Sequence, residues 1–429
     1  MTLRIAIVGG GIGGLAAALF LRRAGLEAQV YEQASELHPV GAGIVVAPNM
    51  VRLLRKLGVI QTPPIQTLPG SVSPLAAGGE LVPGSSVGAP PAADPPGFVR
   101  LEAAWEFRRW MDGRVLSVQP MGDECERLYG APCYVAHRAD VVALLQRALP
   151  VEQLRLDHRL VALAQDEHEV ALTFASRDGR QRQIAADVVI GADGIHSVVR
   201  PAVVAETGAR FSGLSAFRCL VPADSAPEMA VRPVQTLWLG PGRHFVHYPI
   251  SGGQLVNVVA FVPAGEWRNE SWTAAGDVAD LRAEFASWDR RLRQLTASAI
   301  RTLRWAIFDR EPLAQWTAGR ISLLGDAAHA MLPFFAQGAA QAVEDAAVLA
   351  VCLAGASSAS APAALQRYEQ LRRPRASQVQ LMSRGREVQN HLDDGPAQEA
   401  RDAALASSEP LRQSAWLYGH DVEADLARP

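Results

Sequence analysis

The stretch IAIVGGGIGGLAAALFLRRAGLEAQVYEQ, residues 5–33, determines the fold. Residues 4–8 are mostly β-branched or apolar, which predicts a buried parallel strand. Residues 15–24 favour a helix that ends at Gly25, and residues 28–31 predict a second strand. The chain therefore begins with a strand, a helix and a strand, the unit from which doubly wound α/β sheets are built.

Three glycines between the first strand and the helix follow the spacing GxGxxG: Gly9, Gly11 and Gly14. In this pattern Gly9 allows a tight turn, Gly11 lets the backbone approach a pyrophosphate, and Gly14 lets the helix pack closely on the strand. The helix N-terminus would then face the phosphates. Glu32 ends the second strand, where a carboxylate holds a ribose hydroxyl. The unit predicts a dinucleotide site without choosing NAD or FAD; the alternative is a glycine-rich packing turn.

The composition excludes several classes of protein. The chain has 429 residues, enough for two interdependent domains or one elaborated α/β unit. Its formal net charge of -3 gives no global field that favours nucleic acid or an anionic membrane. The four cysteines show neither a CxxC pair nor zinc-like spacing, so we expect free thiols and no metal site. The apolar start is too short to span a bilayer, and we expect a cytoplasmic monomer or homodimer.

The composition and the hydrophobic pattern change several times in the middle of the chain. Residues 61–97 are rich in Pro, Gly, Ser and Ala, which predicts an extended surface insertion. Asp112-Gly113 and Asp178-Gly179 each lie between strand-like runs and predict hairpin turns. Residues 206–265 are mostly strand-like, and residues 277–287 favour a helix.

Two further turns give the glycine motif its context. VVIGADGIHSVVR, residues 188–200, ends a strand at Asp193, and ISLLGDAAH, residues 321–329, ends another at Asp326. Taken singly, each carboxylate most simply caps the next helix. In the order GxGxxG, GADG, GDAAH, they resemble the class A FAD-dependent aromatic monooxygenases, and most closely the salicylate and hydroxybenzoate hydroxylase branch. The resemblance covers nearly the whole chain, including AWEFRRW, YVAHRAD and DGPAQEARDAAL.

The resemblance implies an α/β fold in which a Rossmann-like FAD-binding domain of the GR2/PHBH type is interleaved with a mainly β substrate domain and followed by C-terminal helices. The expected FAD-binding domain comprises residues 1–60, 135–205 and 306–362, the Pro/Gly-rich insertion residues 61–99, the substrate domain residues 100–134 and 206–305, and the C-terminal helical region residues 363–429. The insertion has no counterpart in the family pattern, and it leaves the FAD motifs intact.

For the ADP half of FAD, the resemblance implies binding by Gly9, Gly11, Gly14 and Glu32. Arg138, in YVAHRAD, matches an arginine that helps to bind FAD near its phosphates.

For the flavin half, the resemblance places Asp193 near both FAD and the nicotinamide cofactor, with no second nucleotide domain. Asp326 would bind the ribityl chain. Gly338 and Ala339 would begin a helix whose N–H groups face the flavin pyrimidine edge, where a helix N-terminus stabilises the negative charge of reduced flavin. Pro333 would lie close to the place where oxygen reacts.

The substrate side is predicted from the strand RHFVHYP, in which His244, Val246 and Tyr248 share one face. His244 and Tyr248 match a histidine and a tyrosine that similar hydroxybenzoate and hydroxynicotinate hydroxylases place against the bound ring. A histidine with an ordinary pKa of about 6.5 can accept a phenolic proton at neutral pH. The alternative is a strand histidine satisfied by backbone or solvent. Arg218 could pair with a substrate carboxylate as a fork, or serve structurally at a domain seam.

These residues imply an FAD-dependent monooxygenase that hydroxylates an aromatic substrate, phenolic or an aromatic acid. NADH or NADPH would reduce the flavin, and O2 would add to give a C4a-hydroperoxide that transfers its distal oxygen. A salicylate-type reaction would also release carbon dioxide, and the sequence leaves this open. The alternative function is a flavin-binding protein with impaired or different chemistry, such as a flavin reductase or a halogenase; the halogenase motif WxWxIP is missing from the sequence.

Overall fold

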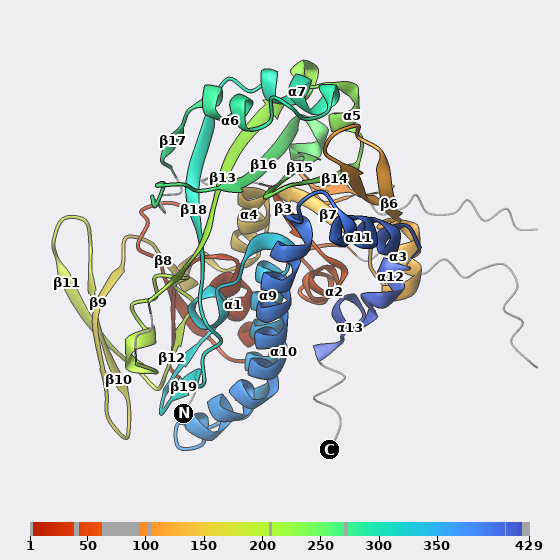
Figure 1. Cartoon of the computed structure of the whole chain (residues 1–429). Coiled ribbons are helices and arrows are strands. Elements are labelled where there is room, and N and C mark those ends of the chain that lie inside the picture. Colours follow the sequence, from red (N-terminus) through yellow and green to blue (C-terminus); the bar gives the residue numbers. More distant parts are fainter. Residues whose placement is uncertain are drawn as a thin grey trace, which may run out of the picture.

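The computed structural model describes residues 3–37, 43–61, 94–101, 104–205, 208–269, 273–407 and 409–422. Two large sheets dominate the molecule, one in each half, and long helices run between them (Figure 1). Most of the predicted Pro/Gly-rich insertion, residues 62–93, lies outside the described residues. Within those ranges, none of the helices combines the length and the apolar character needed to cross a membrane.

A six-stranded sheet forms around β1 (Ile5–Val8), in the order β19–β20–β12–β1–β2–β8. The other strands are β2 (Ala28–Tyr31), β8 (Leu154–Arg155), β12 (Val188–Gly191), β19 (Thr317–Ala318) and β20 (Ile321–Leu323). All neighbours are parallel except β19 and β20. Strands β1 and β12 are buried throughout, as expected for a parallel sheet that is covered on both faces. The predicted opening unit is therefore confirmed.

Helix α1 spans Ile12–Arg23 and begins three residues earlier than predicted, so that Gly11 is its N-cap and Gly14 lies within its first turn. Gly9 has a φ of +110°, a conformation that favours glycine, and a Cβ at Gly14 would lie only 2.0 Å from the carbonyl oxygen of Gly9. The backbone of the helix thus touches the turn that precedes it. This close approach is why the helix starts inside the glycine motif rather than after it.

The second large sheet has eight strands, in the order β17–β18–β13–β16–β15–β14–β5–β6. Their bounds are β5 (Ala104–Arg109), β6 (Val115–Gln119), β13 (Arg210–Pro222), β14 (Val234–Gly240), β15 (Arg243–Ile250), β16 (Leu255–Pro263), β17 (Ala275–Gly276) and β18 (Thr302–Asp309). Neighbours are antiparallel apart from β14 and β5. One face packs on α6 (Val278–Glu284) and α7 (Arg290–Ala297), which cover it at the top of Figure 1. Helix α6 ends at Glu284, three residues before the predicted end at Ser287, and Phe285 is its C-cap.

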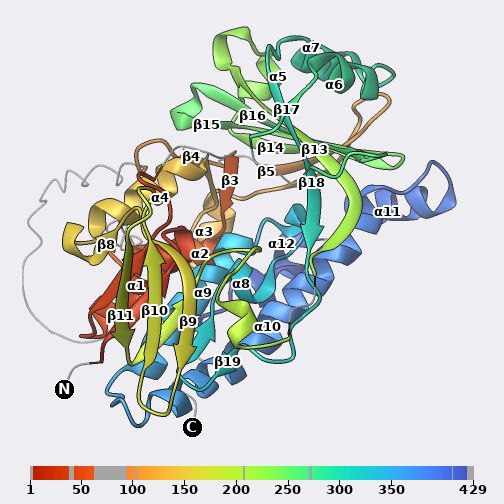
Figure 2. The same ribbon diagram turned by 90° about the vertical axis from the view of Figure 1, so that its left-hand side faces the viewer.

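Two smaller sheets complete the strand content. Figure 2 shows the sheet β11–β10–β9 along the side of the amino-terminal half, and its β10–β11 hairpin confirms the turn at Asp178-Gly179. The strands are β9 (Arg159–Gln165), β10 (Val170–Ala175), β11 (Gln181–Ala186) and, in the second small sheet, β3 (Gly43–Val46), β4 (Val99–Arg100) and β7 (Tyr134–His137). The antiparallel pair β5–β6 likewise confirms the turn at Asp112-Gly113.

Helices connect the two halves. The apolar helix α9 (Gly338–Leu353) packs on α1, and the 30-residue helix α10 (Ala361–Asn390) packs on α9 and ends beside the eight-stranded sheet (Figure 2). The remaining helices are α2 (Pro48–Lys56), α3 (Asp123–Tyr129), α4 (Arg138–Ala148), α5 (Glu228–Val231), α8 (Asp326–His329), α11 (Pro396–Ser407), α12 (Pro410–Gln413) and α13 (Ala415–Tyr418). The mainly helical C-terminal region is as predicted.

The contact between Gly14 and Gly9 predicts that Gly14→Ala destabilises the protein by about 1–3 kcal/mol, because the added methyl group must push the helix from the strand. Urea unfolding measures this change. Gly385→Ala is the control: Gly385 lies in α10 with nothing within 4 Å of the added methyl, so this variant should gain about 0.5–1 kcal/mol. Equal stability of Gly14→Ala and the wild type would contradict the close-packing explanation.

Candidate active site

A cavity of about 400 Å³ lies between the N-terminus of α1, the eight-stranded sheet and the segment that joins β20 to α9. It brings together most of the predicted site residues, from distant parts of the chain. Those that line it are Gly11, Arg138, Arg218, His244, Val246, Tyr248, Asp326, Pro333, Gly338 and Ala339. Four predicted residues are not among its lining: Gly9, Gly14, Glu32 and Asp193.

One end of the cavity is formed by the glycine motif. Gly11 presents open space: a Cβ there would meet only the Nη2 atom of Arg138, at 3.8 Å. Glu32 lies directly behind, where its Oε2 accepts the N–H of Gly10 at 2.7 Å and its Oε1 accepts that of Ala34 at 2.9 Å. The carboxylate is thus held at the end of β2 beside the turn, as a ribose-binding residue requires.

Asp193 occupies a different position. Its Oδ2 accepts the backbone N–H groups of Val198, at 2.7 Å, and Val199, at 3.2 Å. Burial raises the pKa of its carboxyl. The side chain therefore holds the turn after β12 and is not the cap of the short 3₁₀-helix that follows, whose N-cap is Val199; its contact with a cofactor stays a prediction.

The opposite end of the cavity is formed by Asp326 and the start of α9. The Asp326 side chain is exposed to the cavity, and desolvation by the protein around it raises the pKa of its carboxyl. A Cβ at Gly338 would lie 3.8 Å from its Oδ1. Within the part of the chain that the structure describes, no side chain caps the N-terminus of α9, so the first N–H groups of that helix face the cavity without a side-chain partner. Pro333 begins a short 3₁₀-helix that precedes them.

The substrate side is formed by the eight-stranded sheet. The predicted alternation on β15 is confirmed: His244, Val246 and Tyr248 line the cavity, while His247 points to the other face and accepts the Nε1–H of Trp238 at 3.1 Å. Burial raises the pKa of the Tyr248 hydroxyl well above its ordinary value.

A half-buried cation, Arg218, faces the same space. The guanidinium of Arg218 lies 3.8 Å from the ring centroid of Trp305, in a cation–π contact. Burial lowers the pKa of Arg218 to about 10, so the side chain still carries its charge at neutral pH.

His244 differs from the expectation in one respect. It is 1% exposed, and burial together with the nearby His391 holds its pKa well below 6.5, so the ordinary histidine pKa assumed from the sequence is wrong for this site. Its Nδ1 lies 2.6 Å from the Nε2 of His391. No sequence signal marks His391 as its neighbour, because the two residues are 147 positions apart.

Comparisons with known proteins agree with this geometry. The FAD binding domain family matches residues 2–383. Over 419 residues the chain is 39% identical to a 3-amino-4-hydroxybenzoate 2-monooxygenase of Streptomyces platensis, covering 98% of this chain and 96% of that one. It is 34% identical over 387 residues to a 6-hydroxynicotinate 3-monooxygenase of Bordetella bronchiseptica, covering 89% and 90%. The chain belongs to the FAD-dependent aromatic monooxygenases. A substrate complex of salicylate hydroxylase, a member of known structure, matches with a TM-score of 0.75 and 26% identity over 99% of this chain and 97% of that one.

The cavity of this monooxygenase fits FAD. The glycine turn leaves room for a pyrophosphate, the carboxylate of Asp326 is open to the cavity, and the N-terminus of α9 offers free N–H groups. When bound, FAD supplies electron transfer from NAD(P)H and the activation of O2. The chain itself binds and orients the cofactor and the substrate, and it excludes water from the cavity. The expected fold class, family and cofactor are therefore confirmed.

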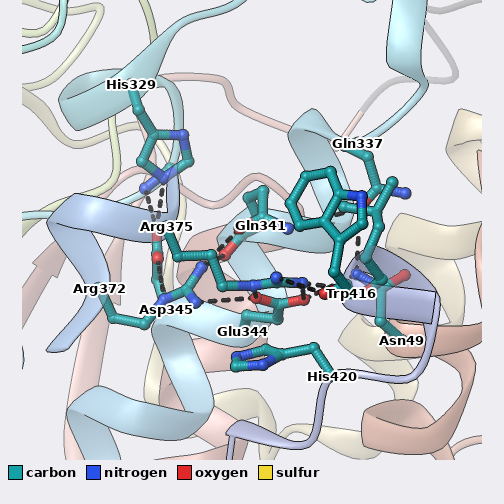
Figure 3. Close-up of polar contacts among 12 residues, drawn as sticks. Asn49, His329, Gln337, Gln341, Glu344, Asp345, Arg372, Arg375, Trp416 and His420 are labelled. Carbon is teal, nitrogen blue, oxygen red and sulfur yellow. Dashed lines mark hydrogen bonds and ion pairs between the residues drawn. The ribbon is translucent and has the colours of Figure 1, made fainter. Parts of the chain in front are cut away.

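Behind Asp326 and the start of α9 lies a buried polar cluster that we did not predict (Figure 3). Asp345 on α9 accepts the Gly325 N–H at 3.0 Å and contacts His329 Nε2 at 2.6 Å, both with Oδ2, while its Oδ1 accepts the Nε–H of Arg372 at 2.8 Å. These contacts hold both ends of the segment that carries Asp326. The signal in the sequence was an acidic pair within the otherwise apolar helix GAAQAVEDAAVL.

The other acid of that pair, Glu344, holds the start of α9 in place through its hydrogen bonds. Arg372 and Arg375 both donate to its Oε2 at 2.8 Å. Asn49 donates to its Oε1 at 2.7 Å and to Gln337, the residue just before α9, at 3.0 Å. Burial alone would raise the pKa of Glu344, but the arginines outweigh it and the pKa is lowered. The acid is therefore ionised and paired.

The cluster predicts that Arg372→Met destabilises the protein by about 3–5 kcal/mol, because buried Asp345 loses its guanidinium and buried Glu344 keeps only Arg375 as a cation. The amount of FAD that the purified protein retains should also fall, because the segment around Asp326 is held less firmly. Chemical unfolding and FAD fluorescence measure both effects. Arg373→Met is the control, because Arg373 is 39% exposed and pairs at 3.4 Å with Glu369; its effect should stay within about 0.5 kcal/mol. Similar effects of the two variants would contradict a special role of the cluster.

Proposed function

We propose that the protein hydroxylates a small aromatic acid that also carries a phenolic hydroxyl group, with 3-amino-4-hydroxybenzoate as the first candidate. The observation that supports this is the presence of a half-buried cation, Arg218, and a buried imidazole, His244, on the same wall of one cavity. NADH or NADPH serves as reductant. We place the enzyme in the cytoplasm, in keeping with its four free cysteines.

The strand register supports opposite ends for these two groups. Arg218 on β13 and Val246 on β15 both stand opposite Val259 on β16. The backbone of Arg218 is therefore two strand spacings, about 10 Å, across the sheet from that of Val246, whereas His244 lies two residues along β15, in the perpendicular direction. A ring that lies diagonally beside Val246, between these two residues, would have the arginine at one end and the imidazole at the other.

Arg218 favours an anion at its end. A guanidinium in a low-dielectric cavity attracts a carboxylate strongly and offers a planar fork to both oxygens. Its stacking on Trp305 orients that fork. The relatives agree with this assignment, because 3-amino-4-hydroxybenzoate and 6-hydroxynicotinate both combine a carboxylate with a ring hydroxyl.

His244 acts at the other end as the acceptor of the phenolic proton. Removing this proton makes the ring electron-rich, which favours attack on an electrophilic oxygen. Val246 and Phe261 supply an apolar wall, and Tyr248 closes the strand side. Pro333 lies on the segment that separates this wall from the flavin end.

The remaining assignments concern FAD. Gly9, Gly11, Gly14, Glu32 and Arg138 would hold its ADP half, and Asp193, Asp326, Gly338 and Ala339 its flavin half. The interleaved division into FAD-binding segments 1–60, 135–205 and 306–362 and substrate segments 100–134 and 206–305 forms part of the same proposal.

Product analysis tests the proposed function. The purified enzyme, loaded with FAD, is given NADH or NADPH, O2 and a panel of hydroxylated aromatic acids. We expect one acid to stimulate both reductant and oxygen uptake and to gain one oxygen atom by mass spectrometry. The mass also distinguishes simple hydroxylation from hydroxylation with loss of carbon dioxide. Reductant consumption that yields only hydrogen peroxide with every acid would favour the flavin-reductase alternative.

The role of Arg218 predicts that Arg218→Met weakens binding of 3-amino-4-hydroxybenzoate by about 2–5 kcal/mol, because the buried carboxylate loses its partner. The matched ligand is 2-aminophenol, which has the same ring groups without the carboxylate. Its affinity should change little in the same variant. Fluorescence titration of the bound flavin measures both. An equal loss of affinity for the two ligands would show that Arg218 is structural.

A further inference from the structure

His391 closes the far side of His244. It follows the last residue of α10, and its carbonyl accepts the Gly242 N–H at 3.0 Å, which ties the end of this helix to the turn before β15. The ring centroids of the two histidines are 4.8 Å apart, and Phe334 contacts both rings. His391 is half-buried, whereas His244 is buried.

The nitrogen atoms of the two rings form a line from the cavity outward. Nδ1 of His244 faces Nε2 of His391 at 2.6 Å. Nε2 of His244 belongs to a side chain that lines the cavity, and among the described residues nothing hydrogen-bonds to it. Within the same ranges, Nδ1 of His391 also has no protein partner, and its ring is partly open to solvent.

A single buried base would face an electrostatic cost in this position. Burial and His391 lower the pKa of His244, and burial lowers that of His391 to about 4, so neither ring readily holds a charge at neutral pH. The charged neighbours do not offset this. Arg243 pairs with Glu284 at 2.9 Å, Asp394 with Arg109 at 2.6 Å, and Arg386 lies over the ring of Phe335.

We propose that His391 completes a two-histidine relay that carries the phenolic proton of the substrate from the cavity to solvent. The idea rests on the proposed function. The substrate O–H gives its proton to Nε2 of His244, the Nδ1 proton of His244 passes to Nε2 of His391, and Nδ1 of His391 releases a proton to water. One proton enters and one leaves, so both rings stay neutral and the substrate becomes a phenolate. The reverse transfer resets the rings when the product oxygen takes up a proton.

Proton release on binding tests the relay without any turnover. The FAD-loaded enzyme is mixed with 3-amino-4-hydroxybenzoate in weakly buffered solution without reductant, and a pH indicator follows the released proton by stopped flow. His391→Gln keeps a polar side chain but cannot pass a proton. It should slow the release by about 100-fold, the lower end of what a positioned proton-transfer group contributes, with FAD and ligand affinity retained. His391→Ala should slow it equally, and added imidazole should restore it.

Two comparisons separate a relay from a packing role. His247→Gln removes an equally buried ring from the opposite face of β15, and release should keep its wild-type rate. His244→Ala and the double variant His244→Ala/His391→Gln should release the proton equally slowly, because the two rings act in series. Should His391→Ala lose FAD, His391→Gln carries the test alone.

The outcomes also separate this proposal from the one on which it rests. Wild-type release in His391→Gln, or effects that multiply in the double variant, would refute the relay and leave the aromatic hydroxylation untouched. A wild-type enzyme that hydroxylates the acid but releases no proton on binding it would refute the relay as well. A wild-type enzyme that neither binds nor hydroxylates any acid of the panel would refute the proposed function first.

Discussion

The end of the cavity around Asp326 depends on the buried carboxylate of Asp345. This carboxylate contacts three groups from separate elements. These are the Gly325 N–H in the turn after β20, the His329 ring in α8 and the Arg372 guanidinium in α10. An ionised acid in this position is stable only while all of these partners remain, since an unpaired buried charge costs several kcal/mol. The cluster therefore makes the placement of Asp326 conditional on the docking of the long C-terminal helix. The cofactor site and helix α10 of the C-terminal region therefore stabilise each other.

Local patterns predicted the parts of the site that local backbone determines. The glycine turn after β1, the turns after β12 and β20 and the alternation on β15 each depend on a few consecutive residues, so their spacing is visible in the sequence. The ordered set of three turns then identified the family. The start of α1 was misplaced because the packing of Gly14 on Gly9 is a contact rather than a propensity.

Contacts between distant segments could not be read in this way. Arg372 and Asp345 are 27 residues apart on different helices, and His391 and His244 are 147 apart. Periodicity indicates that a helix position is buried but not which side chain from another helix meets it. The acidic pair Glu344-Asp345 was the one visible hint, because charged residues in an apolar helix are almost never buried without partners.

The substrate side shows how burial sets opposite demands on two charged groups. Excluding water strengthens the attraction of Arg218 for an anion, because the dielectric around the guanidinium is low. The same burial penalises an imidazolium at His244 and therefore weakens it as a lone base. A cavity with a dielectric low enough for Arg218 to attract an anion strongly is too apolar for His244 to hold a proton as an imidazolium. His244 can therefore act as a base only if the proton leaves it as quickly as it arrives. Placing His391 on the outer side of the ring at 2.6 Å meets that requirement, since a proton can cross the wall of the cavity without any charge resting within it.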